Sequence, residues 1–291
     1  MASQVVTTNG RWPTMLAFMQ ERFSNVSEST WQQRFTNGDV LDANGRPLSC
    51  TAPFKNGQRI YYSRHVDDEI TVPFKEQIVF EDELIIVADK PHFLPTVPGG
   101  QYVEQTLLRR LQQSTSNPNL IAAHRLDRET AGLVLLVKNA RYRGVYQQLF
   151  ATRLVQKIYH AIAPFNQTLR LPLDHEACIE ESDHFMQMRV CHGPMNSHTH
   201  IAILRTVAHG RCHFILRPTT GRKHQLRLHM ASLSMPILGD QIYPIMRPFE
   251  PIKEARWDDP LQLLAQGLAF IDPVTQFERS FTSTLTLKTS V

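Results

Sequence analysis

Residues 124–141 read HRLDRETAGLVLLVKNAR, and they carry the strongest local signal in the chain. Asp127 stands between Arg125 and Arg128, shortly before the apolar run Leu133–Val137. Such a run predicts a buried strand, so the carboxylate is expected at the edge of the core. A carboxylate in that position needs nearby cations to stay ionised. A structural ion-pair network is the simpler local interpretation, and a catalytic carboxylate is the alternative.

The segment His-Arg-Leu-Asp-Arg-x-Thr-x-Gly-Leu resembles the active-site motif of the RluA-type pseudouridine synthases, which isomerise uridine in structured RNA. Further stretches resemble motifs of the same family in the same order. They are VFEDELIIVADKP (79–91), KIYHA (157–161), LRPTTGRKHQLRLH (216–229) and PILGDQIY (236–243). With a final segment resembling Leu-x-Phe-x-x-Pro, the resemblance covers about residues 78–273.

The resemblance implies a catalytic set of three residues. Asp127 is expected to act at the ribose, either as a nucleophile or as an anionic stabiliser, as carboxylates do in glycosidases. Tyr159 is expected to stack on the uracil and to be the base for the proton on carbon 5. Arg222 is expected to pair with Asp127, because a guanidinium binds a carboxylate in a fork. Without the resemblance, Tyr159 would be interpreted as a strand-packing aromatic residue.

RNA contacts are expected from cationic and polar side chains of the same motifs. Arg125 is the candidate to fill the gap left when a uridine leaves its stack. The remaining expected RNA-binding residues, some of which could instead hold the local fold, are Arg128, Lys157, Lys223, Gln225 and Arg227.

Uridine and pseudouridine are isomers, so their interconversion needs neither a redox cofactor nor a metal. The sequence contains no dinucleotide fingerprint and no phosphate-binding loop. His224 and His229 are five residues apart and do not share a helix face, and His124 with Asp127 has no third ligand at a familiar interval. We therefore expect no metal site and no cofactor, and we interpret the histidines as structural.

Cysteine spacing and hydropathy bear on the cellular compartment. The four cysteines are widely spaced, with no Cys-x-x-Cys pair, so neither a zinc site nor a disulfide framework is expected. The chain opens without a basic segment followed by an apolar stretch, and no run is long enough to cross a bilayer. These features favour a cytoplasmic protein without membrane contact, and a monomer is the simplest expectation.

The first seventy residues differ from the rest in charge. They contain seven basic and seven acidic side chains, so the formal net charge of +4 belongs to residues 71–291. Apolar residues at helical spacing predict a helix over 15–23, and Ser27 is placed to cap a second helix carrying Trp31 and Phe35. Asn-Gly pairs at 37–38 and 44–45 indicate turns. The layout resembles a small alpha-L type RNA-binding domain, but its neutral charge equally fits a packing or partner-binding module.

Residues 65–77 predict a linker, followed by a catalytic domain over 71–291. Within it we expect strands at 84–88, 133–137, 158–163, 201–207 and 212–217, and helices at 104–113, 141–153 and 222–233. This mixture predicts an α+β fold. The resemblance implies a mixed, largely antiparallel, bent sheet with flanking helices and a central RNA cleft.

Charge is unevenly distributed along this domain. Residues 184–239 contain no Asp or Glu, but they hold seven Arg or Lys and eight of the thirteen His residues, which favours a positive face toward phosphates. The acidic residues at 174–183 are interpreted as a solvated loop. The chain departs from the family pattern at Ala131, Phe93, Leu264 and Asp272, where serine, glycine and two histidines are common.

Two other functions remain open from the sequence. One is an RNA-binding protein that keeps this fold without catalysis, although the presence of Asp127, Tyr159 and Arg222 argues against it. The other is a nucleic-acid glycosylase or metal-dependent hydrolase that uses the same carboxylate. Release of uracil or breaks in the RNA chain would distinguish the second from an isomerase.

Overall fold

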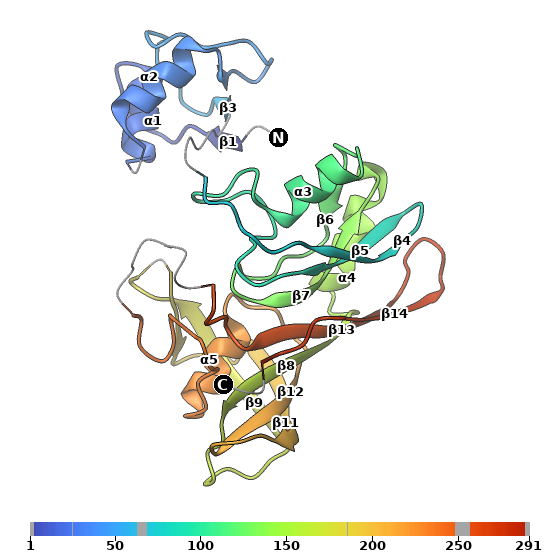
Figure 1. The fold of residues 1–291 in the computed structure, drawn as a ribbon. Helices are drawn as coiled ribbons and strands as arrows, with labels where there is room; N and C mark the ends of the chain where they lie inside the picture. The colour runs from blue at the N-terminus through green and yellow to red at the C-terminus, as the bar shows by residue number, and fades with distance from the viewer. Residues whose placement is uncertain (1–2, 25, 63–68, 185, 248–256, 289–291) are drawn as a thin grey trace. The chain divides into compact units, whose positions relative to one another are not determined.

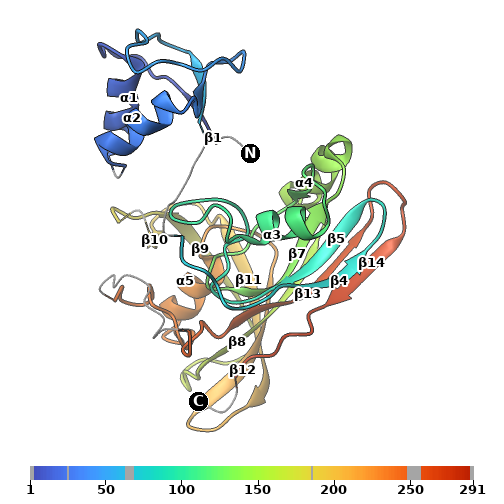
Figure 2. The same cartoon turned by 45° about the horizontal axis from the view of Figure 1, so that its top comes forward.

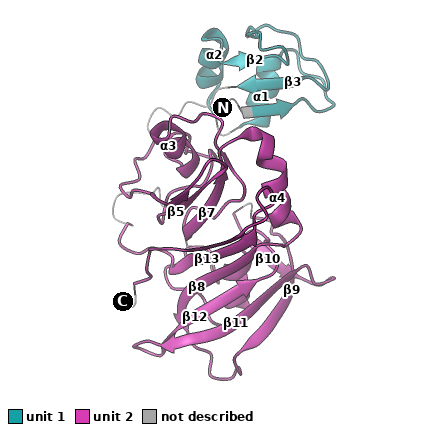
Figure 3. Cartoon of the chain, turned by 90° about the vertical axis from the view of Figure 1, so that its right-hand side faces the viewer, with its two compact units in different colours: residues 1–68 teal, residues 69–291 magenta. Residues whose placement is uncertain are grey.

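The computed structural model describes residues 3–24, 26–62, 69–184, 186–247 and 257–288. The chain divides into two compact units, residues 1–68 and 69–291 (Figure 3). Residues 65–68 of the predicted linker lie outside the described residues, and residues 69–76 form neither helix nor strand.

The first unit packs two helices and a three-stranded antiparallel sheet around one apolar core. The helices are α1 (Met15–Arg22) and α2 (Glu28–Thr36), and the strands β1 (Ser3–Val6), β2 (Val40–Leu41) and β3 (Arg59–Tyr62) pair in the order β1-β3-β2. Ser27 caps α2 as expected, because its Oγ accepts a hydrogen bond of 3.1 Å from the Thr30 amide. Trp31 and Phe35 are buried against α1 residues in this core.

The second unit is built on one mixed sheet, which in its described residues has eleven strands in the order β10-β9-β11-β12-β8-β13-β7-β5-β4, with β14 beside β13 and β6 beside β7. β13 and β7 pair in parallel, and every other pairing between these strands is antiparallel. The predicted α+β class with a largely antiparallel sheet is therefore confirmed. The strands are β4 (Gln77–Glu81), β5 (Ile85–Lys90), β6 (Ile121–Ala122), β7 (Ala131–Val137), β8 (Gln156–Pro164), β9 (Leu173–Glu181), β10 (Met188–Cys191), β11 (Ser197–Thr206), β12 (Arg211–Pro218), β13 (Leu263–Ile271) and β14 (Glu278–Thr282).

Strand β7 lies between two layers of helix, which explains its unbroken apolar sequence. Val134 and Leu136 pack on the side of α3 (Leu107–Ser114), whereas Leu133 and Leu135 pack on the side of α4 (Arg143–Ala151). A short 3-10 turn, Ala140–Tyr142, precedes α4. Alternate side chains of a strand point to opposite faces, so both faces must be apolar when both are covered. Figures 1 and 2 show α3 and α4 beside β5 and β7.

Helix α5 (Gln225–Ser232) covers another part of the sheet, where Leu226 and Met230 pack against residues of β8, β11 and β12. The predicted helix over 222–233 starts three residues late, because His224 has a left-handed backbone with φ of 55°. Arg222 therefore lies in the loop before the helix and not in its first turn. The other predicted strands and helices of this unit are present with boundaries that differ by a few residues.

Two interpretations of the 174–191 region are wrong. The acidic stretch forms most of β9, a strand whose Ala177 and Ile179 are buried while Glu180 and Glu181 face solvent. Cys178 and Cys191 form a disulfide, with Cα atoms 5.3 Å apart, because they are directly opposite each other in β9 and β10. Sequence spacing gave no sign of this pair, since strand register alone brings the two together.

Phe93 stands where the family pattern has glycine, and its backbone has a φ of 66° that favours glycine. Its ring is buried and packs against Phe74, with ring centroids 6.0 Å apart, and against Trp257, with centroids 5.0 Å apart. Apolar burial of a large ring offsets the cost of the left-handed backbone.

Gly132 is the second residue of β7, and this position tolerates no side chain. Gly132 has a φ of 112°, and a Cβ there would lie 2.3 Å from the carbonyl oxygen of Ala265 in β13. We expect Gly132→Ala to lower the free energy of unfolding of the second unit by about 3 kcal/mol or more, because backbone strain adds to the clash. Urea denaturation followed by tryptophan fluorescence measures this change.

Gly144 in α4 supplies the matched control, because no heavy atom lies within 4 Å of a Cβ placed there. Gly144→Ala should be neutral or stabilising by up to about 1 kcal/mol, as in other exposed helix positions. Equal unfolding midpoints for Gly132→Ala and the unmutated chain would show that β7 and β13 can separate without cost.

Candidate active site

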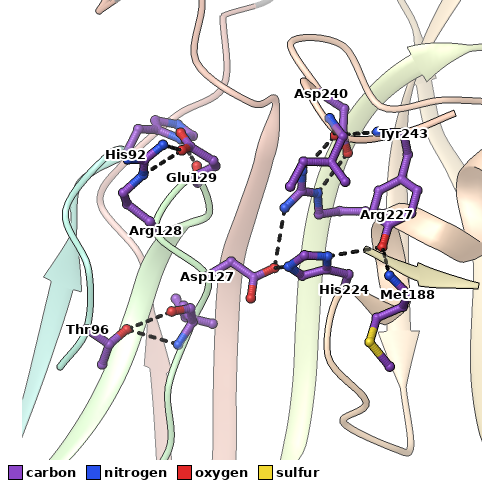
Figure 4. Close-up of polar contacts among 12 residues, drawn as sticks. His92, Thr96, Asp127, Arg128, Glu129, Met188, His224, Arg227, Asp240 and Tyr243 are labelled. Carbon is purple, nitrogen blue, oxygen red and sulfur yellow. Dashed lines mark hydrogen bonds and ion pairs between the residues drawn. The ribbon is translucent and has the colours of Figure 1, made fainter. Parts of the chain in front are cut away.

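The loop that carries Asp127 runs from β6 to β7 and is held by buried hydrogen bonds. Thr96 Oγ1 accepts from the Leu126 amide at 3.0 Å and donates to the Leu126 carbonyl at 2.8 Å (Figure 4). Lys90 is fully buried, and its Nζ donates to the carbonyl of Arg128 at 3.1 Å. Leu126 is itself buried, so the backbone on both sides of Asp127 is fixed.

Lys90 comes from the Asp-Lys-Pro segment at the end of β5. Burial lowers its pKa to about 7, against the charges of Glu129 and Asp127, which raise it. Its ammonium also donates to the carbonyls of Pro91 at 3.0 Å and Leu94 at 2.8 Å. Three carbonyl acceptors compensate for the loss of water around the buried group.

Asp127 faces two side chains of the α5 region, which approach the same carboxylate oxygen. Arg227 Nη1 lies 3.7 Å from Oδ2, and His224 Nε2 lies 3.8 Å from it (Figure 4). Arg227 is 2% exposed and binds Asp240 through two short bonds, Nε to Oδ2 at 2.8 Å and Nη2 to Oδ1 at 2.7 Å. Burial acts to lower the pKa of Arg227, but the hydrogen bonds and charge of Asp240 outweigh it and raise the pKa.

We expected Arg222 to pair with Asp127, but the charged neighbours of the carboxylate are Arg227 and His224. The Arg222 side chain is exposed, and its Nε donates to the Asn196 carbonyl at 3.3 Å. Its place in the loop before α5 is the reason. In the predicted helix over 222–233, positions 224 and 227 are three residues apart and share a face, so helical spacing could have grouped them, although His224 itself lies before the first turn of α5.

His224 is held from behind by Tyr243. The Tyr243 hydroxyl accepts from the Met188 amide at 2.8 Å and lies 3.0 Å from His224 Nδ1 (Figure 4). Burial lowers the pKa of His224 to about 4, so the ring is neutral near neutral pH. A neutral imidazole has one N–H and one acceptor nitrogen, so the partner of Nδ1 influences whether Nε2 carries the proton or the lone pair toward Asp127.

Asp127 and Tyr159 line one cavity of about 190 Å³. Tyr159 comes from β8 and is half-buried between the packing clusters on the two sides of the cavity. Burial, together with the charge of Asp127, raises the pKa of Tyr159. Of the described residues that line this cavity, Asp127 is the one carboxylate.

The expected RNA-binding residues fall into two groups. Arg125 and Lys223 are exposed at the cavity, and Lys157 lines it while its Nζ donates to the Thr220 carbonyl at 2.8 Å. Arg128 instead pairs with Glu129 and lies over the ring of Tyr102.

Two predicted RNA contacts have internal tasks. Gln225 is 4% exposed, accepts from Thr220 Oγ1 at 2.7 Å and donates to the His198 carbonyl at 3.0 Å, so it shapes the loop before α5. Arg227 is buried against Asp240, as described above, and its charge faces Asp127 and not an RNA phosphate.

The histidines of the motifs are hydrogen-bonded within the fold. His124 stacks on Phe150, and its Nε2 accepts from the Leu135 amide at 3.1 Å. His229 is fully buried between Ser197 Oγ at 2.8 Å and Thr199 Oγ1 at 3.0 Å. Burial lowers the pKa of both to about 3. His229 therefore adds no positive charge near neutral pH to residues 184–239, the stretch without Asp or Glu.

In the described ranges, no three or more His, Cys, Asp or Glu side chains are arranged to hold a metal ion. Nor does any helix described there combine the length and apolar character needed to cross a membrane.

Comparisons with known proteins identify one family. Residues 84–232 match the family model for RNA pseudouridylate synthase. An uncharacterized RNA pseudouridine synthase from Synechocystis sp. is 31% identical over 235 residues, 79% of each chain. The dual-specificity RNA pseudouridine synthase RluA from Vibrio vulnificus is 33% identical over 221 residues, 72% of this chain and 83% of that one.

A solved structure leads to the same family. Human RNA pseudouridylate synthase domain containing 4 superposes with a TM-score of 0.56 at 26% identity, covering 72% of this chain and 88% of that one. Fold, motif order and sequence identity thus agree over the greater part of the second unit, and the chain belongs to the RluA-type RNA pseudouridine synthases, a family of RNA-modifying isomerases.

Proposed function

We propose that this chain converts a uridine in structured ribosomal or transfer RNA to pseudouridine, with Asp127 acting at the ribose. The observation that carries the proposal is the position of Asp127, the single carboxylate among the described residues of a cavity that Tyr159 and several cations also line. The RluA relative, a dual-specificity RNA enzyme by name, supports an RNA substrate.

The reaction breaks the bond between uracil N1 and ribose C1′, turns the base, and joins C5 to C1′. The proton on C5 is lost, N1 regains one, and no electrons are exchanged. Positive charge develops at C1′ when the base leaves, so an anion there either bonds to the sugar or stabilises it. Asp127 is 33% exposed and is held by fixed neighbours, which suits both forms of this role.

Tyr159 provides a flat wall for the detached base. Aromatic rings bind uracil through stacking, and the hydroxyl remains protonated because its pKa is raised. A proton from C5 can therefore reach Tyr159 only if the hydroxyl gives up its own. The geometry thus supports the stacking role more directly than the expected role as a base.

Arg227 and His224 hold and orient the charge of Asp127. The guanidinium plane is already set by its fork with Asp240. The Tyr243 hydroxyl accepts from Met188 and has its own proton to donate to His224 Nδ1; in the tautomer that accepts this bond, the ring proton is on Nε2, facing Asp127. Preorganised donors of this kind cost no rearrangement during the reaction.

Asp127→Asn should lower the rate of pseudouridine formation by at least about a thousandfold, because the amide carries no charge. RNA binding should change little, since the side chain keeps its shape. Mapping of pseudouridines in RNA from cells that lack the gene and are complemented with each variant measures the effect and names the substrate.

Asp259→Asn is the matched control, because Asp259 is exposed and does not line the cavity. It should restore every modified position. Modification by the Asp127→Asn variant would refute the assigned role, and release of free uracil by the unmutated enzyme would point to a glycosylase.

Arg227→Lys should lower kcat by about a hundredfold, because lysine cannot keep the fork with Asp240 while facing Asp127. Arg222→Lys should change kcat by less than about threefold, because Arg222 supplies a positive charge at the cavity edge and lysine keeps that charge. Single-turnover rates of both variants on the same RNA test the assignment. A larger loss in Arg222→Lys would restore the pairing predicted from the sequence.

Tyr243→Phe should lower kcat by about tenfold and leave KM unchanged, because His224 loses the partner that orients its ring. Tyr146→Phe is the control. Tyr146 is buried and its hydroxyl donates to Asp272 at 3.0 Å, outside the cavity. Both variants should lose about 1–3 kcal/mol of stability through an unmade buried hydrogen bond. Equal losses of kcat in the two would show that the Tyr243 effect is one of stability alone.

A further inference from the structure

A second cavity of about 370 Å³ adjoins the catalytic one. Tyr159, Arg125, Lys157 and Arg222 line both cavities and separate them. The residues that line only the second cavity include His124 of the first motif and three others that belong to none of the quoted motifs: Phe150 near the end of α4, Arg153 just after that helix, and Asn196.

The lining of this cavity is cationic without compensation. Its described residues include Arg125, Arg153, Lys157 and Arg222 but neither Asp nor Glu. In the described part of the chain, none of these four forms an ion pair with a carboxylate within 4 Å. Burial, together with the charge of Arg153, lowers the pKa of Lys157 to about 8.

Two other cations of the site differ from these four because each has a carboxylate partner. Arg128 is paired with Glu129, and Arg227 with Asp240, so each has a partner within the fold. The four cations of the second cavity repel one another, and Lys157 is partly buried as well. Such an arrangement is stabilised when an anion enters.

The position of the second cavity beside the catalytic one indicates which anion it binds. Every nucleotide of an RNA chain is joined to its neighbours through phosphodiesters, and a ribose held beside Asp127 places one of them close to the shared wall. Arginine and lysine are the side chains that bind phosphate most readily. Phe150, half-buried and stacked on the neutral ring of His124, adds an aromatic surface suited to a neighbouring base.

We propose that the second cavity is a subsite for the nucleotide adjoining the target uridine, with Arg153 as a ligand of its phosphodiester. The inference rests on the proposed function, since it presumes that the uridine occupies the first cavity. It extends the RNA contact beyond the motif residues to the end of α4, where Arg153 has a left-handed φ of 61°.

The test uses the full chain in an Asp127→Asn background, so that no RNA is converted. Binding of fluorescein-labelled hexauridylate is measured by anisotropy between about 50 and 200 mM KCl. Arg153→Ala should weaken binding by about tenfold at the lower salt and reduce the slope of log K against log salt by about 0.7–1, as for one lost phosphate contact.

Arg143→Ala is the matched control, because Arg143 is an exposed arginine at the start of α4, the helix that Arg153 follows, and it does not line the cavity. It should leave both affinity and slope unchanged. Equal losses in the two variants would mean that net charge alone attracts the RNA, and an unchanged Arg153→Ala variant would remove Arg153 from the interface. Either result overturns the proposal.

Two further measurements separate this subsite from the catalytic site. With Asp127 intact and cellular RNA as substrate, Arg153→Ala should raise KM and leave kcat within about twofold; a fall in kcat alone would contradict a phosphate subsite. Competition of uridine 3′-monophosphate, uridine 5′-monophosphate and inorganic phosphate against hexauridylate shows which side of the uridine is bound. A nucleotide should compete better than inorganic phosphate, and the reverse would indicate an isolated anion site.

Failure of the mechanism would look different from failure of the subsite. Activity in the Asp127→Asn variant would refute the catalytic assignment without altering hexauridylate binding. An unaltered salt slope in Arg153→Ala would refute the subsite while Asp127 remained essential.

Discussion

One buried guanidinium organises the active site. Arg227 is almost inaccessible, is locked to Asp240 by two short hydrogen bonds, and still has a nitrogen 3.7 Å from Asp127. A bidentate pair fixes the plane of the guanidinium as well as its position. The positive charge beside Asp127 is therefore fixed in position, and it is in place before the substrate binds. Removing Arg227 would leave the buried carboxylate of Asp240 without the cation that pairs with it, so fold and chemistry depend on the same side chain.

The opposite side of Asp127 is held by the backbone. Lys90 is the last residue of β5 and Thr96 lies in the segment that follows, and both bind main-chain groups of the loop that carries Asp127. Buried hydrogen bonds to main-chain atoms restrain a loop that would otherwise be mobile. Gly132 then lets β7 pass close to β13, which joins the loop to the centre of the sheet. Rigid anchors on both sides give the carboxylate a defined place at the cavity.

The cations of the site form two groups, those with a carboxylate partner and those without one. Cations with internal partners, such as Arg227 and Arg128, shape the protein around Asp127. Cations without carboxylate partners within 4 Å in the described chain, such as Arg125 and Arg153, line the second cavity. Lys157, which lines the same cavity, is also partly buried, and desolvation makes an unpaired cation costly to keep. The paired cations thus belong to the fold, and the unpaired ones are those that we propose to bind the RNA.

Local features of the sequence were sufficient for much of the fold. The apolar runs of β5 and β7 and the helical spacing in α4 depend on neighbours a few residues away, and each was predicted from its pattern. Asp127 also stood out locally, because a carboxylate crowded by arginines before a buried strand is unusual, but its catalytic interpretation came from the resemblance of the motif to the family. Ser27 needed only the three residues that follow it to cap α2.

Other features required partners that are distant in the sequence. The Cys178–Cys191 disulfide follows from strand register, and β9 was missed because its exposed carboxylates concealed a buried face. Because α5 starts at Gln225, Arg227 and not Arg222 approaches Asp127. The turn after α4 places Arg153 in a cavity that four other segments also line: 124–125, 157–159, Asn196 and 220–222.

The sequence by itself therefore determined the fold class, the family and the central carboxylate, since these depend on composition, periodicity and motif order. The tertiary structure alone decided which cation serves Asp127, which polar residues are buried, and where the unpaired charges meet. The physical reason is that burial and charge pairing are set by through-space distances, which spacing along the chain does not specify.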